Sequence, residues 1–109
     1  MIYELRVYRC VPGRLAALLR RLETGGVSLF KRHGIRPVGF WTVEIGPSSS
    51  SELVYLLQWE SLSERERKYA SFLADADWVA LRDESEKDGP IVASITNYIL
   101  APTQFSALK

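Results

Sequence analysis

The sequence predicts an α+β protein of the ferredoxin-like class, with four antiparallel strands and helices on one face of the sheet. Two observations lead to this prediction. First, strand-like and helix-like stretches follow one another in the order β-α-β-β-α-β. Second, each strand-like stretch has one polar and one apolar face, because strand side chains alternate with period two. A right-handed crossover around the first helix then places the apolar face under the helices.

The first strand is expected over residues 2–11, where apolar and polar side chains alternate and Pro12-Gly13 follows with a turn. Its apolar and polar faces are formed by Tyr3, Leu5 and Val7 and by Glu4, Arg6 and Tyr8, respectively. Because apolar side chains are the ones usually buried, we expect the apolar face to lie against the helices.

A helix is expected from residue 14 to His33. Its buried stripe has the spacing i, i+3, i+4, i+7 and begins with Leu15, Leu18, Leu19 and Leu22. Basic residues, Arg21 among them, are assigned to the outer face. Gly25-Gly26 disfavours the helix by about 1 kcal/mol per glycine relative to alanine, so we expect a kink or local break there. Gly34 occupies the place of a left-handed C-cap.

The second strand is expected over residues 36–45, and the third, a central one, over residues 53–60. The next helix begins at Ser63–Glu66, which fits a capping box. Asp75 or Asp77 is expected to cap a short helix after it.

The fourth strand is expected over residues 91–100, and the assembled sheet then has a second face that is polar but not highly charged. It is formed in part by Glu4, Arg6, Tyr8, Thr42 and Glu44. Val54 and Leu56 interrupt these polar residues, and contiguous apolar surface usually marks an interface. We therefore predict a homodimer joined sheet to sheet. Its seam would contain an ion-pair network of Glu4, Arg6 and Glu44, although paired carboxylates could also serve catalysis.

The composition limits the partners and the chemistry. The 109 residues suit one domain, 1–109, and a net charge of +1 provides no electrostatic drive toward nucleic acid or anionic lipid. One cysteine and one histidine cannot make an all-Cys/His zinc site, and we expect no metal and no cofactor. Because no leader-like or membrane-spanning run is present, we expect a cytoplasmic protein that does not contact a membrane.

Two side chains are candidates for catalysis. Histidine titrates near neutral pH, and His33 is the only one in the chain. Tyr55 would lie under the helices, where its hydroxyl could position a ligand oxygen. For His33 we favour the alternative of a helix-terminal residue that satisfies backbone carbonyls. Further side chains on the helix side are expected either to bind a ligand or to pack in the core: Tyr3, Trp41, Trp59 and Asn97.

Motifs spread along the whole chain resemble the NIPSNAP family. They are Met1-Ile2-Tyr3-Glu4-Leu5-Arg6, Pro12-Gly13, His33-Gly34, Gly39-Phe40-Trp41-Thr42, Glu44-Ile45-Gly46, Ser61-Leu62-Ser63-Glu64-Arg65 and Ile99-Leu100-Ala101-Pro102. The resemblance implies a dimeric α+β barrel. A departure is Tyr55 and Leu57, where the family often has a histidine and a tryptophan.

The resemblance implies a fold more firmly than a reaction, and two readings of function remain open. Related dimeric α+β barrels include cofactor-free oxygenases, cyclases and isomerases, which hold ligands between sheet and helices. We favour a homodimer that binds a small aromatic or acyl molecule there. The alternative is a non-catalytic structural or protein-interaction module. RNA binding fits the strand order, but the sheet lacks the stacking aromatic motif, and Glu4 and Glu44 would repel phosphate.

Overall fold

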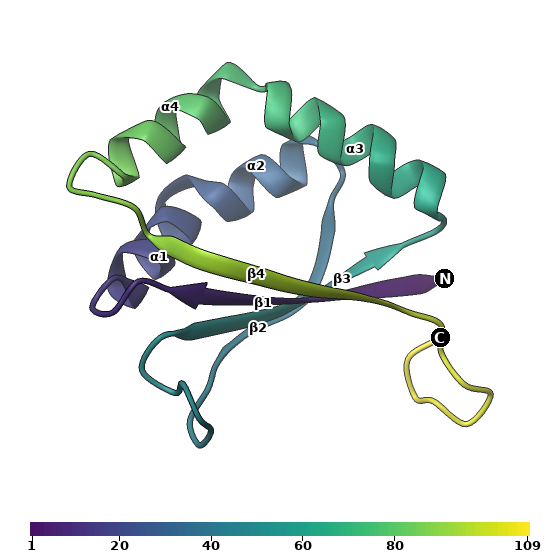
Figure 1. Ribbon diagram of the computed structural model, residues 1–109. Coiled ribbons are helices and arrows are strands. Elements are labelled where there is room, and N and C mark those ends of the chain that lie inside the picture. Colours follow the sequence, from purple (N-terminus) through teal and green to yellow (C-terminus); the bar gives the residue numbers. More distant parts are fainter.

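The computed structural model describes residues 1–109 and confirms the predicted α+β fold (Figure 1). The four strands form one antiparallel sheet in the order β2-β3-β1-β4. The elements are β1 (Ile2–Cys10), α1 (Leu15–Arg21), the π-helical η1 (Leu22–Gly26), α2 (Val27–Arg32), β2 (Arg36–Thr42), β3 (Glu52–Trp59), α3 (Leu62–Ala74), α4 (Ala76–Ser85) and β4 (Val92–Leu100).

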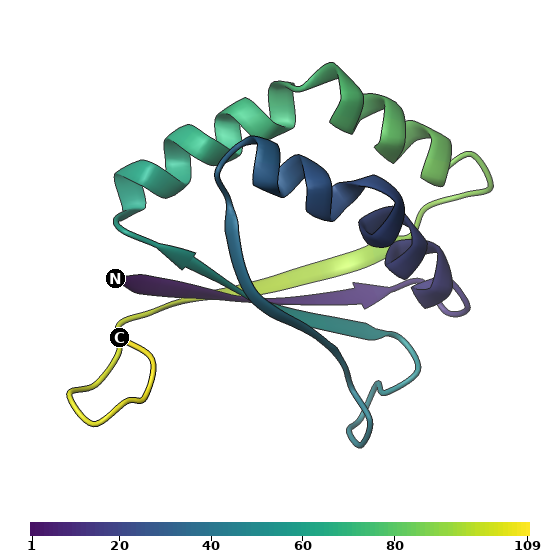
Figure 2. The same cartoon turned by 180° about the vertical axis from the view of Figure 1, so that it is seen from behind.

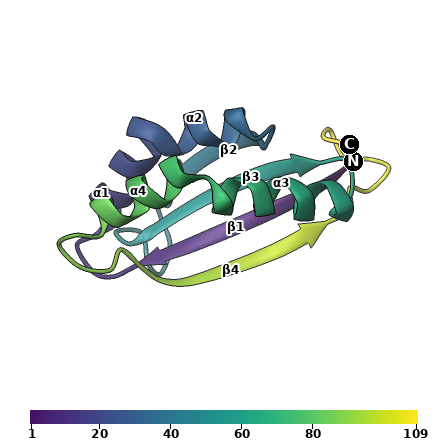
Figure 3. The same ribbon diagram turned by 90° about the horizontal axis from the view of Figure 1, so that it is seen from above.

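All helices lie on one face of the sheet, and the opposite face is open (Figure 2). Seen from above, α1 to α2 and α3 to α4 form two rows across the sheet, and β4 lies beyond them at the edge (Figure 3). The core between the layers is built from Leu18, Leu29, Phe30, Leu57, Trp59 and Phe72, among others. No helix is long and apolar enough to cross a membrane.

The pairing register shows which face of β1 lies under the helices. Arg6 pairs with Tyr55 and Tyr8 with Leu53, and directly paired residues point to the same face. Tyr55 and Leu53 are buried in the core, so Glu4, Arg6 and Tyr8 lie on the helix side. The prediction that these three residues lie on the open face is therefore wrong.

The open face is instead built from the apolar side of β1, and two further placements need correction. Tyr3 pairs with Gln58 and Trp41 with Val54, so both aromatic residues lie on the open face and not under the helices. Thr42 pairs with Leu53 and lies on the helix side at the sheet edge, while Glu44 follows the end of β2 in the connecting loop. The predicted seam of Glu4, Arg6, Tyr8, Thr42 and Glu44 therefore does not form one surface.

The turn and cap predictions are mostly confirmed. Gly34 has a φ of +70° at the end of α2, and the Asp75 side chain caps α4 by accepting a hydrogen bond from the Asp77 amide at 2.8 Å. The cap of α3 is Ser61 and not Ser63: its hydroxyl accepts from the Glu64 amide at 3.1 Å. The irregularity expected at Gly25-Gly26 is a π-helical turn, Leu22–Gly26, which interrupts the α-helix between α1 and α2.

Candidate functional site

A cleft of about 610 Å³ separates the sheet from the helices. Its lining comes from β1, β3 and β4 below and from both helical rows above, and 13 of the 20 lining residues are hydrophobic. The apolar walls include Leu18, Leu22, Phe30, Phe72, Trp78 and Ile95. Concave, mostly apolar sites of this size with a few convergent polar groups are typical of small-molecule binding.

The floor of the cleft carries a polar group formed by Arg6, Tyr8 and Tyr55. Arg6 donates from Nε to the Tyr55 hydroxyl at 3.2 Å and from Nη2 to the Tyr8 hydroxyl at 3.1 Å. The two hydroxyl oxygens are 2.8 Å apart and share one hydrogen bond. Tyr55 donates the shared bond, so the O–H hydrogen of Tyr8 makes no hydrogen bond within the protein.

Two tyrosines of this region, Tyr55 and Tyr69, have a raised pKa because they are buried. Burial raises the pKa of Tyr55 well above its ordinary value, and Tyr8 and Tyr69 add to the effect. Burial also raises the pKa of Tyr69, whose hydroxyl oxygen is enclosed and has no hydrogen-bond partner in the protein. At neutral pH these phenols are donors and not bases.

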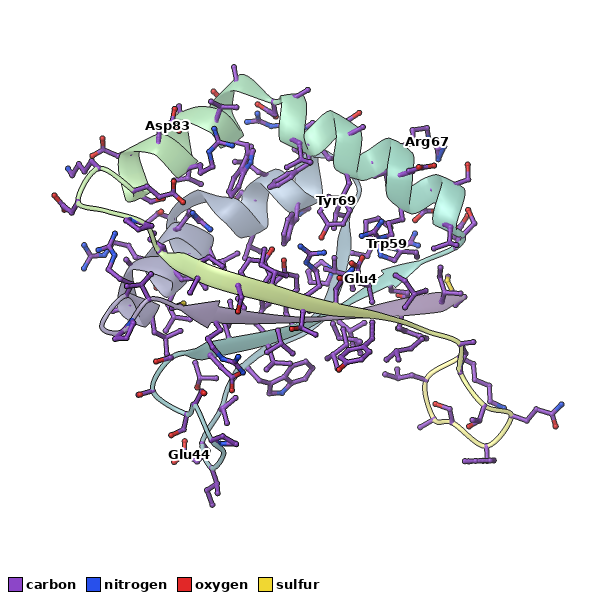
Figure 4. The ribbon with its side chains drawn as sticks, viewed as in Figure 1. Glu4, Glu44, Trp59, Arg67, Tyr69 and Asp83 are labelled. Carbon is purple, nitrogen blue, oxygen red and sulfur yellow. The ribbon has the colours of Figure 1, made fainter.

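Behind the floor, Glu4 is fully buried and collects hydrogen bonds from four side chains. Arg65 donates from Nε at 2.7 Å and from Nη2 at 3.0 Å, and Arg6 donates from Nη1 at 2.8 Å. Trp59 Nε1 and Asn97 Nδ2 donate at 3.1 and 3.0 Å. Figure 4 shows Glu4, Trp59 and Tyr69 in the layer between α3 and the sheet, with Glu44 far away on its loop.

The Glu4 cluster gives the floor a positive balance. Burial raises the pKa of the carboxyl group, but the hydrogen bonds from Arg65, Asn97 and Arg6 outweigh it and lower the pKa of Glu4 to about 2. Glu4 is therefore ionised at neutral pH, and one negative charge faces two guanidinium groups. The cleft can consequently offer hydrogen-bond donors and positive potential to a ligand oxygen.

A second basic residue enters the cleft from the other end, where α1 meets α4. Arg21 is 7% exposed, so the expectation that it lies on the outer face of the helix is wrong. Its guanidinium lies 5.2 Å from the centre of the Trp78 ring, and it donates to the Ser85 hydroxyl at 3.4 Å. The Trp78 indole nitrogen is buried without a hydrogen-bond partner.

The structure separates the two predicted catalytic residues. Tyr55 lines the cleft, whereas His33 does not. His33 lies at the end of α2, where its Nε2 is 2.7 Å from Asp75 Oδ2. Hydrogen bonds from His33, from the Asp77 amide and from Arg32 lower the pKa of Asp75 to about 2. This arrangement ties α2 to the cap of α4.

The predicted ligand-binding residues lie on both faces of the sheet, and none of them lines the cleft. Trp59 and Asn97 lie on the helix side as predicted, but they hydrogen-bond Glu4 and do not line the cleft. Tyr3 and Trp41 are on the open face. Sequence reasoning missed Arg6, Tyr8, Arg21, Tyr69 and Trp78 as cleft residues. Tyr55, which was expected under the helices, could have indicated some of them, because the residues that pair with it across the strands lie on the same face of the sheet.

The antiparallel sheet, the helices on one of its faces and the cleft between them define an α+β protein of the ferredoxin-like class. A family model for NIPSNAP matches residues 3–107, and the chain belongs to the NIPSNAP family. The resemblance seen in the sequence is thereby confirmed. No curated protein matches the chain.

Solved structures of NIPSNAP proteins are similar over nearly the whole chain. Atu4242 from Agrobacterium tumefaciens, described as a NIPSNAP family protein with unknown function, is 32% identical with a TM-score of 0.86, and covers 100% of this chain and 94% of its own. A NIPSNAP-like domain protein from Burkholderia xenovorans is 28% identical with a TM-score of 0.84, covering 96% and 87%. Atu5224, also from Agrobacterium tumefaciens, is 26% identical with a TM-score of 0.87, covering 99% and 98%.

Proposed function

We propose that this protein is a homodimer that binds a small aromatic or acyl molecule in the cleft between sheet and helices. The observation that carries the proposal is the combination of apolar walls with a floor of hydrogen-bond donors. An apolar cleft of about 610 Å³ that stays open to water is unfavourable for a protein that only has to pack its core. Buried donors without acceptors are also costly unless a partner satisfies them.

The floor suits a ligand whose oxygen gains negative charge. Arg6 holds the hydroxyls of Tyr8 and Tyr55 in place, and the O–H hydrogen of Tyr8 can donate to a carbonyl or enolate oxygen. Fixed donors of this kind stabilise an oxyanion without reorganisation. Tyr55 donates to the Tyr8 hydroxyl, so we propose that Tyr55 positions Tyr8 as the polarising donor of a cofactor-free oxygenase, cyclase or isomerase. His33 has no part in this proposal, because it lies outside the cleft.

The binding proposal can be tested with N-phenyl-naphthylamine, a neutral aromatic probe that becomes fluorescent in apolar sites. We expect saturable binding, and we expect Ala70→Trp, which places an indole in the cleft lining, to weaken it at least about tenfold. Ala74→Trp on the same helix is the matched control, because residue 74 is exposed and lies outside the lining.

The result also separates the two readings of function. Equal weakening by both variants, or no binding to the unmodified protein, would contradict a binding cleft and favour the non-catalytic interaction module. Circular dichroism of each variant checks that the helices remain folded.

A further inference from the structure

Arg21 is a buried cation whose charge the protein satisfies only in part. A guanidinium group has five N–H donors, yet the one hydrogen bond of Arg21 is the 3.4 Å contact to Ser85 Oγ. The nearest carboxylate oxygen, Glu86 Oε1, is 3.6 Å away, beyond hydrogen-bond distance. Burying a charge costs free energy unless it is paired and hydrogen-bonded. The remaining Arg21 nitrogens make no hydrogen bond within the protein and are not enclosed, so they can donate to an acceptor in the cleft.

The neighbouring Trp78 also has a hydrogen-bond donor without an acceptor. Its ring lies against the Arg21 guanidinium, and its Nε1 hydrogen has no acceptor in the protein. Both residues line the cleft, and neither belongs to the Glu4 cluster. Two sets of donors thus lie within one apolar cleft: the tyrosine floor under α3, and Arg21 with Trp78 between α1 and α4.

The acidic residue at this end of the cleft, Glu86, makes only a long contact with Arg21. The Glu86 side chain is 38% exposed and can turn toward solvent. The other basic lining residue there is Arg82, which contacts the exposed Asp83 at 3.4 Å. An incoming anion would replace only the long contact between Arg21 and Glu86. It would gain charge-assisted hydrogen bonds from the arginine, which are among the stronger hydrogen bonds in proteins.

We infer that the ligand of this cleft is anionic: its apolar body carries a carboxylate-like or sulfonate-like oxygen group, which Arg21 binds with the Trp78 N–H as a second donor. This inference rests on the proposed function, since it assigns a chemical class to the molecule held in the cleft. The apolar walls take the body of the ligand, and its second polar end reaches the floor of Arg6, Tyr8 and Tyr55.

The test compares two probes that share one aromatic skeleton. Anilinonaphthalene sulfonate carries the anionic group, and N-phenyl-naphthylamine is its neutral parent. We expect the unmodified protein to bind the sulfonate at least about tenfold more tightly, the scale of one hydrogen bond to a charged group. Competition by naphthoate, but not by naphthamide, should reproduce this preference.

Arg21→Met keeps the length of the side chain and removes its charge. We expect it to abolish the tenfold preference, because only the sulfonate loses a charged partner. Arg20→Met is the matched control, because Arg20 is exposed and does not line the cleft. Trp78→Phe, which removes only the indole N–H and part of the ring, should reduce the preference in a second, independent way.

The outcomes distinguish this inference from the proposed function. Binding of both probes with equal affinity would overturn the inference and leave the proposed function standing. A preference that survives Arg21→Met and Trp78→Phe would also overturn it, because the anion would then bind elsewhere. Failure of both probes to bind would overturn the proposed function itself.

Discussion

At the scale of the residue, Glu4 organises the helix side of the sheet. Its carboxylate receives hydrogen bonds from β1, β3, β4 and α3, so a single buried group connects three strands to a helix. It also holds Arg6 in the orientation in which the guanidinium reaches Tyr8 and Tyr55. The floor of the cleft therefore depends on a residue that does not itself line the cleft.

Removing the charge of Glu4 should be strongly destabilising. In Glu4→Gln two guanidinium groups lose their buried counter-ion, and breaking a buried pair in this way costs about 3–5 kcal/mol of unfolding free energy. Urea unfolding at neutral pH measures the loss. Glu44→Gln is the control, because Glu44 is exposed on a loop and should change stability little. A loss of equal size in both variants would contradict the role of Glu4.

Acid should have the same effect on the unmodified protein. The pKa of Glu4 is lower in the folded state than in the unfolded state, so its stabilisation is fully present above about pH 4.5 and is lost as the pH falls toward 2. Over this interval the shift corresponds to about 3 kcal/mol. Urea unfolding at pH 5 and pH 3 should show the unmodified protein losing more stability than Glu4→Gln.

The wrong placement of Glu4, Arg6 and Tyr8 shows how much structural information an alternating strand pattern holds. Period-two alternation correctly separates the two faces of β1, but it does not state which face the helices cover. The assumption that the more hydrophobic face is buried gives the wrong face for β1. Its polar side chains are buried because they form hydrogen bonds with one another and with Arg65, and its apolar side is the open one. The side of β3 that faces the helices was predicted correctly. The residues of β1 that share this side follow only from the pairing register of the two strands, and the sequence does not reveal that register.

At the scale of the element, the π-helical turn η1 adapts the first helical row to the second. Gly25 packs directly against α4, and a Cβ atom added there would lie 2.8 Å from Leu81 Cδ2. Gly26 is buried and contributes to the cleft lining. The glycine pair was visible in the sequence as a helix irregularity. Its reason, a close approach of α4, is a tertiary contact that no local pattern shows.

A larger side chain at Gly25 should therefore push the helical rows apart. We expect Gly25→Val to destabilise the protein by about 1–3 kcal/mol through overpacking. Adding Leu81→Ala should recover part of the loss, because it removes the atoms that the new side chain meets. Glu23→Val, at an exposed position of the same turn, measures the helix-propensity cost of valine alone. Thermal unfolding of the unmodified protein, Gly25→Val, Leu81→Ala and the double variant gives the coupling, and strictly additive effects would rule out this contact.

At the scale of the whole molecule, the sheet has more apolar surface than its own helices cover. On β4, Tyr98 and Leu100 pair with residues on the open face of β1 and are 54% and 40% exposed. Trp41 is 51% exposed on the open face, next to half-buried Val54. Exposed apolar surface of this kind usually marks an interface, and a long edge strand invites pairing. The open face is thus a better dimer surface than the one predicted, because its side chains are apolar and not ionic.

We expect light scattering to give a particle of about twice the chain mass of 12.4 kDa. Leu56→Lys places a charge at the centre of the open face, on the central strand β3, and should yield a folded monomer at micromolar concentration, because a buried unpaired ammonium opposes association. Ser71→Lys adds the same charge at an exposed position of α3 and should remain a dimer. A monomeric unmodified protein would contradict the interface. A monomer of Leu56→Lys that still binds the neutral probe would show that one chain holds a complete cleft.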